Sequence, residues 1–256
     1  MSPERAGLTV IPLEGIGEVR PGDDLPAIVG DALERTPDAL PLETGDVLVV
    51  TQKIVSKAEG AVVDLRTVTP RPEAVEFAER YDRDPRQIEV VLREARRVVR
   101  MERGVLITET PHGFVCANAG VDASNVPGED VVCLLPRDPD ATARALHQAL
   151  KEATGAHIAV IIADSFGRPW RNGIVNVAIG AAGIAPLVDY RGQLDDFGRT
   201  MQVSVLAVAD ELASAAELVM GKVNRCPMAL IRGYPYARSD GSARDLIMDS
   251  ASDMFR

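Results

Sequence analysis

Asp164 and Ser165 end an apolar segment in AVIIADSFGRPWRNG (159–173), and both side chains are suited to chemistry. We expect the apolar residues to form a buried strand that ends at Asp164, and ligands of α/β proteins gather at the carboxyl ends of strands. A carboxylate and a neighbouring hydroxyl are oxygen ligands that suit Mg²⁺ or Mn²⁺. The alternative is that Asp164 only caps the turn after the strand.

A second group of polar side chains lies in NAGVDASNV (118–126). Its members, which surround Gly120, are Asn118, Asp122, Ser124 and Asn125. Asp122 is a candidate for the second carboxylate on a metal ion shared with Asp164. The alternative is an Asx-turn, which needs only local hydrogen bonds.

Cationic side chains follow two apolar segments and are placed to meet a phosphate. Lys53 and Lys57 come at and after the end of GDVLVVTQKIV (45–55). Arg168 and Arg171 follow Asp164 and would offset the negative charge of a phosphate bound to metal. The alternatives are lysines that are solvated and arginines that are merely exposed.

Several common catalytic arrangements are missing from the sequence. It has no Walker phosphate loop, no GxGxxG between a strand and a helix, and no GxSxG, HExxH or kinase signature. The three histidines share no spacing with a carboxylate or a thiol. Ser-His-Asp and Cys-His mechanisms therefore have little support.

The formal net charge of −10 argues against non-specific binding to nucleic acid or to an anionic membrane. It leaves an anionic small ligand open, because a few local cations outweigh a distant negative field. The N-terminal segment lacks the apolar region of a signal peptide, and no apolar run approaches the roughly 20 residues that span a bilayer. The three scattered cysteines indicate reduced thiols, so we expect a soluble cytoplasmic protein.

Apolar β-branched segments alternate with helical patterns along the chain. The strands that we expect span residues 45–55, 61–65, 104–109, 114–120, 130–136, 157–165, 201–209 and 227–233, the last at the edge of the sheet. The helices that we expect span residues 23–36, 71–82, 84–100, 138–155 and 210–221. Adjacent strands occur beside strand–helix alternation, so the sequence predicts an α/β class with mixed sheets of the α+β type.

These segments together resemble the coenzyme F420-0:L-glutamate ligase family, the F420:gamma-glutamyl ligases. The resemblance rests on IPLEGIGEVRPGDDL, GDVLVVTQKIVSKAEG, NAGVDASNV, ADSFGRPWRNGIVNVAIGAAGI, DDFGR and ELVMGKVNRCPMALIRG, in this order. It covers nearly the whole chain and is specific, because several long motifs share order and spacing. It implies one family domain over residues 1–256, with a two-lobed fold and an intertwined homodimer.

The resemblance implies an enzyme that joins L-glutamate to the terminal carboxylate of coenzyme F420-0 and then extends a γ-linked glutamate chain. It also implies GTP as co-substrate, a Mg²⁺ or Mn²⁺ ion, and K⁺ as a further aid. We expect GTP to phosphorylate the carboxylate, giving an acyl phosphate that the amine of glutamate attacks. This chemistry needs no enzyme nucleophile, which agrees with the missing triad.

The resemblance also implies roles for single residues. Asp122 and Asp164 match the carboxylates of one metal ion, and Ser165 matches a hydroxyl ligand of a second. Lys57 matches a phosphate-binding lysine, and Arg168 and Arg171 are further candidates for phosphate or substrate carboxylates. The residues expected to contact GTP are Ile16, Gly17, Glu18, Val19, Gln52, Lys53, Lys57, Asn125, Met220, Gly221, Lys222, Val223, Asn224, Arg225 and Cys226.

The chain departs from the family pattern at three positions. Lys222 stands where archaeal members have an acidic ligand of the second metal ion, and a cation cannot ligate a metal. Gln52 and Lys53 lie where the archaeal form has small hydroxyl residues.

The sequence ends near DMFR, where some bacterial relatives continue into a flavin-binding, nitroreductase-like domain. We therefore expect a standalone ligase. Two alternatives stay open: a related amide ligase for another carboxylate acceptor, and a non-catalytic module that binds a nucleotide or a deazaflavin.

Overall fold

The structure, a computed structural model, describes residues 7–249 and 251–253. The first six residues and most of the DMFR motif, on which two expectations about the termini rest, lie outside these ranges. Within them, six α-helices pack with four sheets, which confirms the mixed α/β class. None of the helices in the described ranges has the length and apolar character that a bilayer crossing requires.

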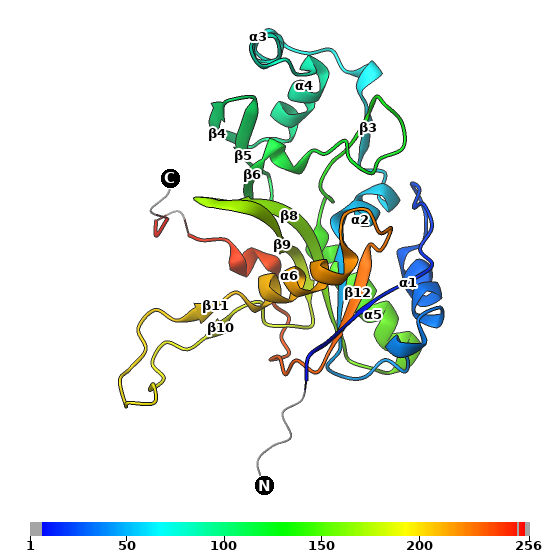
Figure 1. Cartoon of the computed structure of the whole chain (residues 1–256), viewed down its shortest axis with the longest axis vertical. Helices are drawn as coiled ribbons and strands as arrows, with labels where there is room; N and C mark the ends of the chain where they lie inside the picture. The colour runs from blue at the N-terminus through cyan, green and yellow to red at the C-terminus, as the bar shows by residue number, and fades with distance from the viewer. Residues whose placement is uncertain (1–6, 250, 254–256) are drawn as a thin grey trace.

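The main sheet has five strands in the order β1–β12–β2–β8–β9 (Figure 1). Their bounds are Thr9–Pro12 (β1), Val47–Thr51 (β2), Ala159–Arg168 (β8), Arg171–Ala182 (β9) and Met228–Arg232 (β12). β2 and β8 run parallel, and the other neighbours run antiparallel. The end of β2 therefore lies beside Asp164, since Thr51 pairs with Ala163.

Helices cover both faces of the main sheet. α1 (Leu25–Glu34) and α5 (Pro139–Thr154) pack on one face, and α6 (Val208–Met220) packs on the other. Side chains alternate between the faces along β2, so Leu48 and Val50 join the core under α5 while Val47 and Val49 join the core under α6. β2 is therefore apolar on both faces, as a strand buried between two layers requires.

A second group of elements has its own apolar core. Its members are β3 (Val62–Asp64), α3 (Pro72–Tyr81), α4 (Pro85–Glu94), β4 (Arg97–Glu102), β5 (Val105–Glu109), β6 (Val115–Ala117) and β7 (Val131–Cys133). β4, β5 and β6 form an antiparallel sheet, β3 pairs with β7, and Phe77, Ile88 and Leu106 lie in the core. Figure 1 shows this group beyond one end of β8 and β9.

An arm projects from the main sheet (Figure 1). β10 (Val188–Asp189) and β11 (Val205–Leu206) pair antiparallel at its base. The connecting residues extend away from the body of the molecule. The arm carries exposed large apolar side chains at Leu194, Phe197 and Val203.

Most of the predicted elements are confirmed. The predicted helices 23–36, 71–82, 138–155 and 210–221 agree with α1, α3, α5 and α6 to within two residues at each end. Two caps explain this accuracy for α5: the side chain of Asp138 accepts a hydrogen bond from the backbone of Ala141, and Gly155 ends the helix with a φ of 74°.

Three predicted elements are partly wrong. The predicted strand 45–55 ends at Thr51 and is followed by α2 (Gln52–Ala58), because Ile54 and Val55 reach the core from a helix. The predicted helix 84–100 ends at Glu94, and the residues after it form β4 because they pair with β5. The predicted central strand 201–209 is reduced to the short β11, since most of this segment is exposed on the arm.

The main sheet also differs from the prediction at its edges. β12 does not close the sheet but lies between β1 and β2. β9, the longest strand, was not predicted. β8 continues past Asp164 to Arg168 because β9 pairs with it along this length.

Candidate active site

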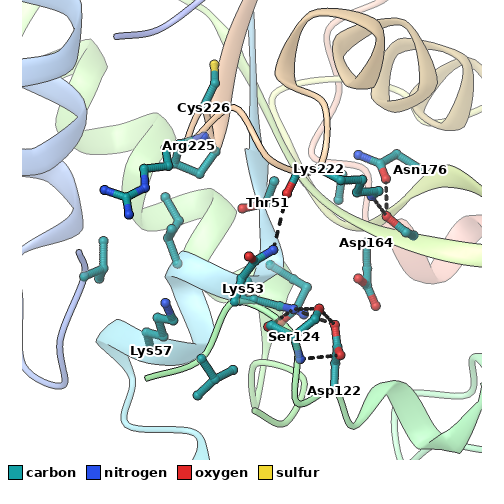
Figure 2. Close-up of a pocket in the computed structure, with 18 of the residues that line it drawn as sticks. Thr51, Lys53, Lys57, Asp122, Ser124, Asp164, Asn176, Lys222, Arg225 and Cys226 are labelled. Carbon is teal, nitrogen blue, oxygen red and sulfur yellow. Dashed lines mark hydrogen bonds and ion pairs between the residues drawn. The ribbon is translucent and has the colours of Figure 1, made fainter. Parts of the chain in front are cut away.

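A cavity of about 970 Å³ opens where β2 ends beside β8. Segments far apart in the sequence line it, and Figure 2 shows their side chains around one space. The predicted site residues that line it are Ile16, Gly17, Glu18, Val19, Gln52, Lys53, Lys57, Asp122, Asn125, Asp164, Ser165, Gly221, Lys222, Val223, Arg225 and Cys226. The fold thus brings most of the predicted site together.

Four predicted residues do not line the cavity. Met220 is buried at the end of α6, and the side chain of Asn224 lies close to Gly221. Arg168 and Arg171 face each other at the end of the β8–β9 hairpin, where Nη2 of Arg168 donates to the carbonyl of Asn172 at 2.8 Å. Ligand contacts of these arginines stay a prediction.

Lysines are concentrated at this cavity. The sequence contains only four, and Lys53, Lys57 and Lys222 line the cavity while Lys151 does not. Each cavity lysine forms an ion pair with a different acid. A lysine ammonium is a compact point charge on a flexible stem, suited to a phosphate oxygen. The scarcity of lysine elsewhere is a signal that motif spacing alone does not reveal.

Asp122, on the loop between β6 and β7, is held by Lys53 from α2. Nζ of Lys53 lies 2.5 Å from Oδ2 of Asp122 and donates to the carbonyl oxygen of Ser124 at 2.7 Å. The backbone N–H and the hydroxyl of Ser124 donate to the same carboxylate at 2.8 and 2.6 Å. Burial acts to raise the pKa of Asp122, but these hydrogen bonds outweigh it and hold the pKa below its ordinary value.

The two interpretations of Asp122 therefore coexist. The backbone N–H of Ser124 bonds the Asp122 side chain two residues earlier, as in the predicted Asx-turn. The same carboxylate also lines the cavity. The turn orients the acid toward the cavity and does not compete with a role in binding.

Asp164 lies inside β8, where it pairs with Val177 of β9. The alternative of a cap on a turn is therefore wrong, because β8 continues as a strand. Burial raises the pKa of Asp164 to about 6, with Asp122 adding to the effect and Lys53 and Lys222 opposing it. These lysines pair with other acids, so within the described ranges Asp164 faces the cavity without an ion pair.

Lys57 enters the cavity from α2 and meets the N-terminal loop. Its side chain is largely buried, and Nζ lies 2.5 Å from Oε1 of the half-exposed Glu18. Glu18 and its neighbours are among the residues predicted to contact GTP. The structure adds that the Glu18 carboxylate now bonds Lys57, so a phosphate at this position has to share or replace it.

A closed ring of hydrogen bonds lies on the β8 side of the cavity. Oγ of Ser165 donates to Oδ1 of Asn176 at 2.6 Å, and Nδ2 of Asn176 donates to Oε2 of Glu217 at 2.8 Å. The other Glu217 oxygen is 2.8 Å from Nζ of Lys222. The ammonium of Lys222 donates in turn to Ser165, which closes the ring.

The sequence motifs do not reveal Asn176, Glu217 or the contact of Ser124 with Lys53. Asn176 is 2% exposed and is the one polar residue of the segment 174–182 of β9. A buried amide in such a strand requires hydrogen-bond partners. The sequence does contain this amide within an apolar segment. Because β9 was not predicted as a strand, Asn176 was not identified as a buried residue that needs partners.

The residues present fit one divalent cation. Mg²⁺ is commonly bound through one or two carboxylates, with phosphate oxygens and waters completing its shell. Asp122 and Asp164 supply two carboxylates to one cavity, and in the part of the chain described the partly buried Asp164 forms no ion pair, although the charges of Lys53 and Lys222 act on it. In the described part of the chain, no group of three or more His, Cys, Asp and Glu side chains is placed to hold a metal by itself.

The residues do not fit a second divalent cation at Ser165. The hydroxyl proton of Ser165 is donated to Asn176, and a lone pair of the same oxygen accepts from Lys222. The ammonium of Lys222 thus lies where a metal ion on Ser165 would have to lie. The prediction of Ser165 as a metal ligand has no support in this arrangement.

Residues 15–233 match the family described as F420-0:Gamma-glutamyl ligase. A protein from Methanothermobacter thermautotrophicus named Coenzyme F420:L-glutamate ligase is 44% identical over 253 residues, 98% of this chain and 99% of that protein. A protein of the same name from Methanopyrus kandleri is 46% identical over 251 residues, 96% of each chain. Another, from Methanocaldococcus jannaschii, is 42% identical over 217 residues, 84% of this chain and 86% of that protein.

Proposed function

Since the chain belongs to the F420-0:Gamma-glutamyl ligase family, we propose that it joins L-glutamate to coenzyme F420-0 and extends a γ-linked glutamate tail. GTP is the proposed co-substrate, with Mg²⁺ or Mn²⁺ as the divalent ion and K⁺ as a further aid. One observation carries the proposal: two carboxylates, Asp122 and Asp164, and three lysines line one cavity, and Lys53 pairs with Asp122. Such a combination suits a triphosphate bound with a divalent ion.

The cavity offers distinct groups to each part of the nucleotide. Lys53 and Lys57 lie on α2, directly after β2, and their ammonium groups would meet phosphate oxygens. Residues 16–19 and the loop after α6 line the cavity and would cover the nucleotide. Figure 2 shows Lys222, Arg225 and Cys226 of this loop beside the cavity. A divalent ion held by Asp122 and Asp164 would neutralise phosphate charge and act as a Lewis acid.

We propose two chemical steps. A carboxylate oxygen of F420-0 attacks the γ-phosphorus of GTP, and the bond to the β–γ bridging oxygen breaks, so that GDP leaves and an acyl phosphate forms. The amine nitrogen of glutamate attacks the acyl carbon, phosphate leaves with the C–O electron pair, and the nitrogen loses a proton. A carboxylate alone has no good leaving group, so it is phosphorylated before the amine attacks. The chain contributes alignment of the reactants and neutralisation of the phosphate charge.

Mass spectrometry of F420-0 incubated with the purified chain, glutamate, GTP and Mn²⁺ tests the proposal. We expect products heavier by one or more glutamyl units, with one GDP and one phosphate formed for each amide bond. The control is Asp164→Asn, which keeps the side-chain shape and removes the charge. GTP hydrolysis without amide formation, or amide formation only with a different carboxylate acceptor, would contradict the proposed reaction.

We also propose a two-lobed chain that acts as an intertwined homodimer. The separate core under α3 and α4 supports two lobes. The projecting arm supports the dimer, because Phe197 and Val203 are each 86% exposed. Large exposed apolar side chains that cluster on one surface are typical of a surface that a partner covers.

Sedimentation of the wild-type chain and of the double variant Phe197→Ser, Val203→Ser tests the dimer. We expect a dimer for the wild type and a shift toward monomer for the variant. A wild-type chain that sediments as a monomer at micromolar concentration would contradict this part of the proposal.

A further inference from the structure

The ammonium of Lys222 is fixed at the cavity by two partners. It forms an ion pair with Glu217 at 2.8 Å and donates to the hydroxyl of Ser165. The backbone of Lys222 is also held, because its carbonyl accepts from Nδ2 of Asn125 at 3.5 Å. Contacts from α6 and β8 therefore set the position of this charge, and a contact from the loop after β6 holds its backbone. Figure 2 shows Lys222 on the side of the cavity where Asn176 and Asp164 lie.

The loop geometry depends on the residue before Lys222. Gly221 ends α6 with a φ of 64°, and an added Cβ would lie 2.6 Å from the side chain of Asn224. Only glycine adopts this conformation without a steric penalty. The chain thus turns sharply after α6 and directs Lys222 back to Ser165 of β8.

The ring leaves Lys222 one donor. An ammonium group has three N–H donors, and the contacts to Glu217 and Ser165 use two of them. Lys222 lines the cavity, as do Glu217 and Ser165. The third donor is therefore available to an anionic ligand in the cavity.

We propose that Lys222 is a fixed cation that takes the place of a second divalent ion and binds a phosphate of the nucleotide directly. The active site then holds one divalent ion, between Asp122 and Asp164, and one ammonium, at Ser165. This inference rests on the proposed function, since it assigns a role within the same nucleotide site. It specifies that the site binds one divalent ion and that Lys222 replaces the second.

The charge of the ring supports this assignment. Glu217 neutralises Lys222 in the ring, and Asn176 and Ser165 are neutral, so the ring has no net charge of its own to attract a second divalent ion. A metal ion would have to displace the ammonium from both Glu217 and Ser165. A phosphate does not have to displace the ammonium, because a phosphate oxygen accepts a charge-assisted hydrogen bond from the free N–H of Lys222.

Counting bound Mn²⁺ tests the inference. The metal-free chain is saturated with a non-hydrolysable GTP analogue, and bound Mn²⁺ is measured by calorimetry and by electron paramagnetic resonance. We expect one Mn²⁺ for each wild-type chain and two for Lys222→Glu, in which the new carboxylate joins Glu217 beside Ser165. Two nearby Mn²⁺ ions also give a spin–spin coupling that a single ion lacks.

Two further variants separate charge from folding. Lys222→Met keeps the length of the side chain, and we expect it to bind the analogue about tenfold more weakly without gaining a second ion. Lys151→Glu makes the same charge change outside the cavity and should stay at one Mn²⁺. Circular dichroism confirms that each variant is folded before ions are counted.

The outcomes distinguish the inference from the function on which it rests. Two Mn²⁺ ions in the wild-type chain, or a Lys222→Glu chain that is folded and still binds one, would overturn the role of Lys222 and leave the ligase proposal standing. A wild-type chain that binds no Mn²⁺ with the analogue would overturn both.

Discussion

Asp122 and Asp164 line the same cavity in different surroundings. Asp122 accepts hydrogen bonds from Lys53 and Ser124, and its pKa is held below its ordinary value. Asp164 lies inside β8 without an ion pair in the part of the chain described, and burial raises its pKa to about 6. The fold compensates one carboxylate and leaves the other uncompensated.

This difference indicates that Asp122 and Asp164 have different roles at the site. A partly buried carboxylate without an ion pair lowers the stability of the fold, and such groups persist chiefly where function requires them. Asp122 is already oriented by α2 before any ligand arrives. Asp164 has no ion pair in the part of the chain described, and the nearby Lys53 and Lys222 pair with other acids, so we infer that it contributes most to metal binding.

The largest expected effect is the loss of turnover in Asp164→Asn. If Asp164 supplies the uncompensated charge, its removal should lower the ligation rate by on the order of a thousandfold or more, since metal-ion stabilisation is worth several kcal/mol. Initial rates of glutamylated product formation at saturating GTP measure this. An unchanged rate with unchanged metal dependence would show that Asp164 does not contribute most to metal binding, and its contrast with Asp122 would then have no functional meaning.

The second prediction concerns stability, where the two acids should give opposite signs. In metal-free protein at pH 7.5, Asp164→Asn should raise the free energy of unfolding by on the order of 2 kcal/mol, because it removes a buried charge. Asp122→Asn should lower it by about 1 kcal/mol, because a half-exposed ion pair with Lys53 is lost and solvent screens it. Urea unfolding of both variants measures the difference.

The pH dependence of these differences follows from the two pKa shifts. The folded pKa of Asp164 lies above its ordinary value of 3.8, so its penalty is absent below about pH 4 and complete above about pH 6. The folded pKa of Asp122 lies below its ordinary value, so its contribution is present at neutral pH and is lost as the pH falls through the folded value. At pH 4 the Asp164→Asn advantage should therefore disappear; an advantage of equal size at both pH values would show that charge is not its cause.

The third prediction concerns the pH dependence of metal affinity. Because the pKa of Asp164 is about 6, Mn²⁺ has to displace a proton below that pH, and its affinity should fall about tenfold for each pH unit. Titration of Mn²⁺ against the chain between pH 5 and pH 8 measures this. Asp122→Asn should bind more weakly throughout and keep a break that lies slightly below pH 6, because burial is the larger cause of the raised Asp164 pKa and the Asp122 charge adds to it. A break that disappears in this variant would assign the proton to Asp122 instead.

The sequence reveals the helices better than the sheets. The caps and apolar spacing of α5 are local signals, and they predict its bounds closely. β9 carries no such signal, because Gly173 and Gly180 interrupt its pattern. Gly180 is required by a long-range contact, since an added Cβ would lie 2.5 Å from the backbone of Pro139. Only the packed structure shows why a glycine belongs inside this strand.

The residues of the site could be predicted from local signals, whereas their long-range contacts could not. The acids, lysines and glycine-rich segments were identified from their types and positions, and the structure gathers most of them at one cavity. The pairing of Lys53 with Asp122 joins residues 69 positions apart, and that of Lys222 with Ser165 joins residues 57 apart. No local spacing encodes such contacts, so the sequence could not show which acid is compensated or that Lys222 bonds Ser165.

The smallest expected effect comes from Arg168→Ala and Arg171→Ala. Both arginines lie at the end of the β8–β9 hairpin, outside the cavity lining, and Nε of Arg168 is buried with no hydrogen-bond partner in the residues described. If they bind a substrate carboxylate at the rim, each substitution should raise the KM for glutamate or F420-0 by about threefold to tenfold with kcat unchanged, because an exposed charge contact is worth little and acts equally in ground and transition states. Steady-state kinetics with each substrate varied in turn measure the split. A fall in kcat comparable to that of Asp164→Asn would show that the arginines at the end of the hairpin carry an essential charge. The contrast between Asp122, which pairs with Lys53, and Asp164, which has no ion pair in the described residues, would then no longer explain the site.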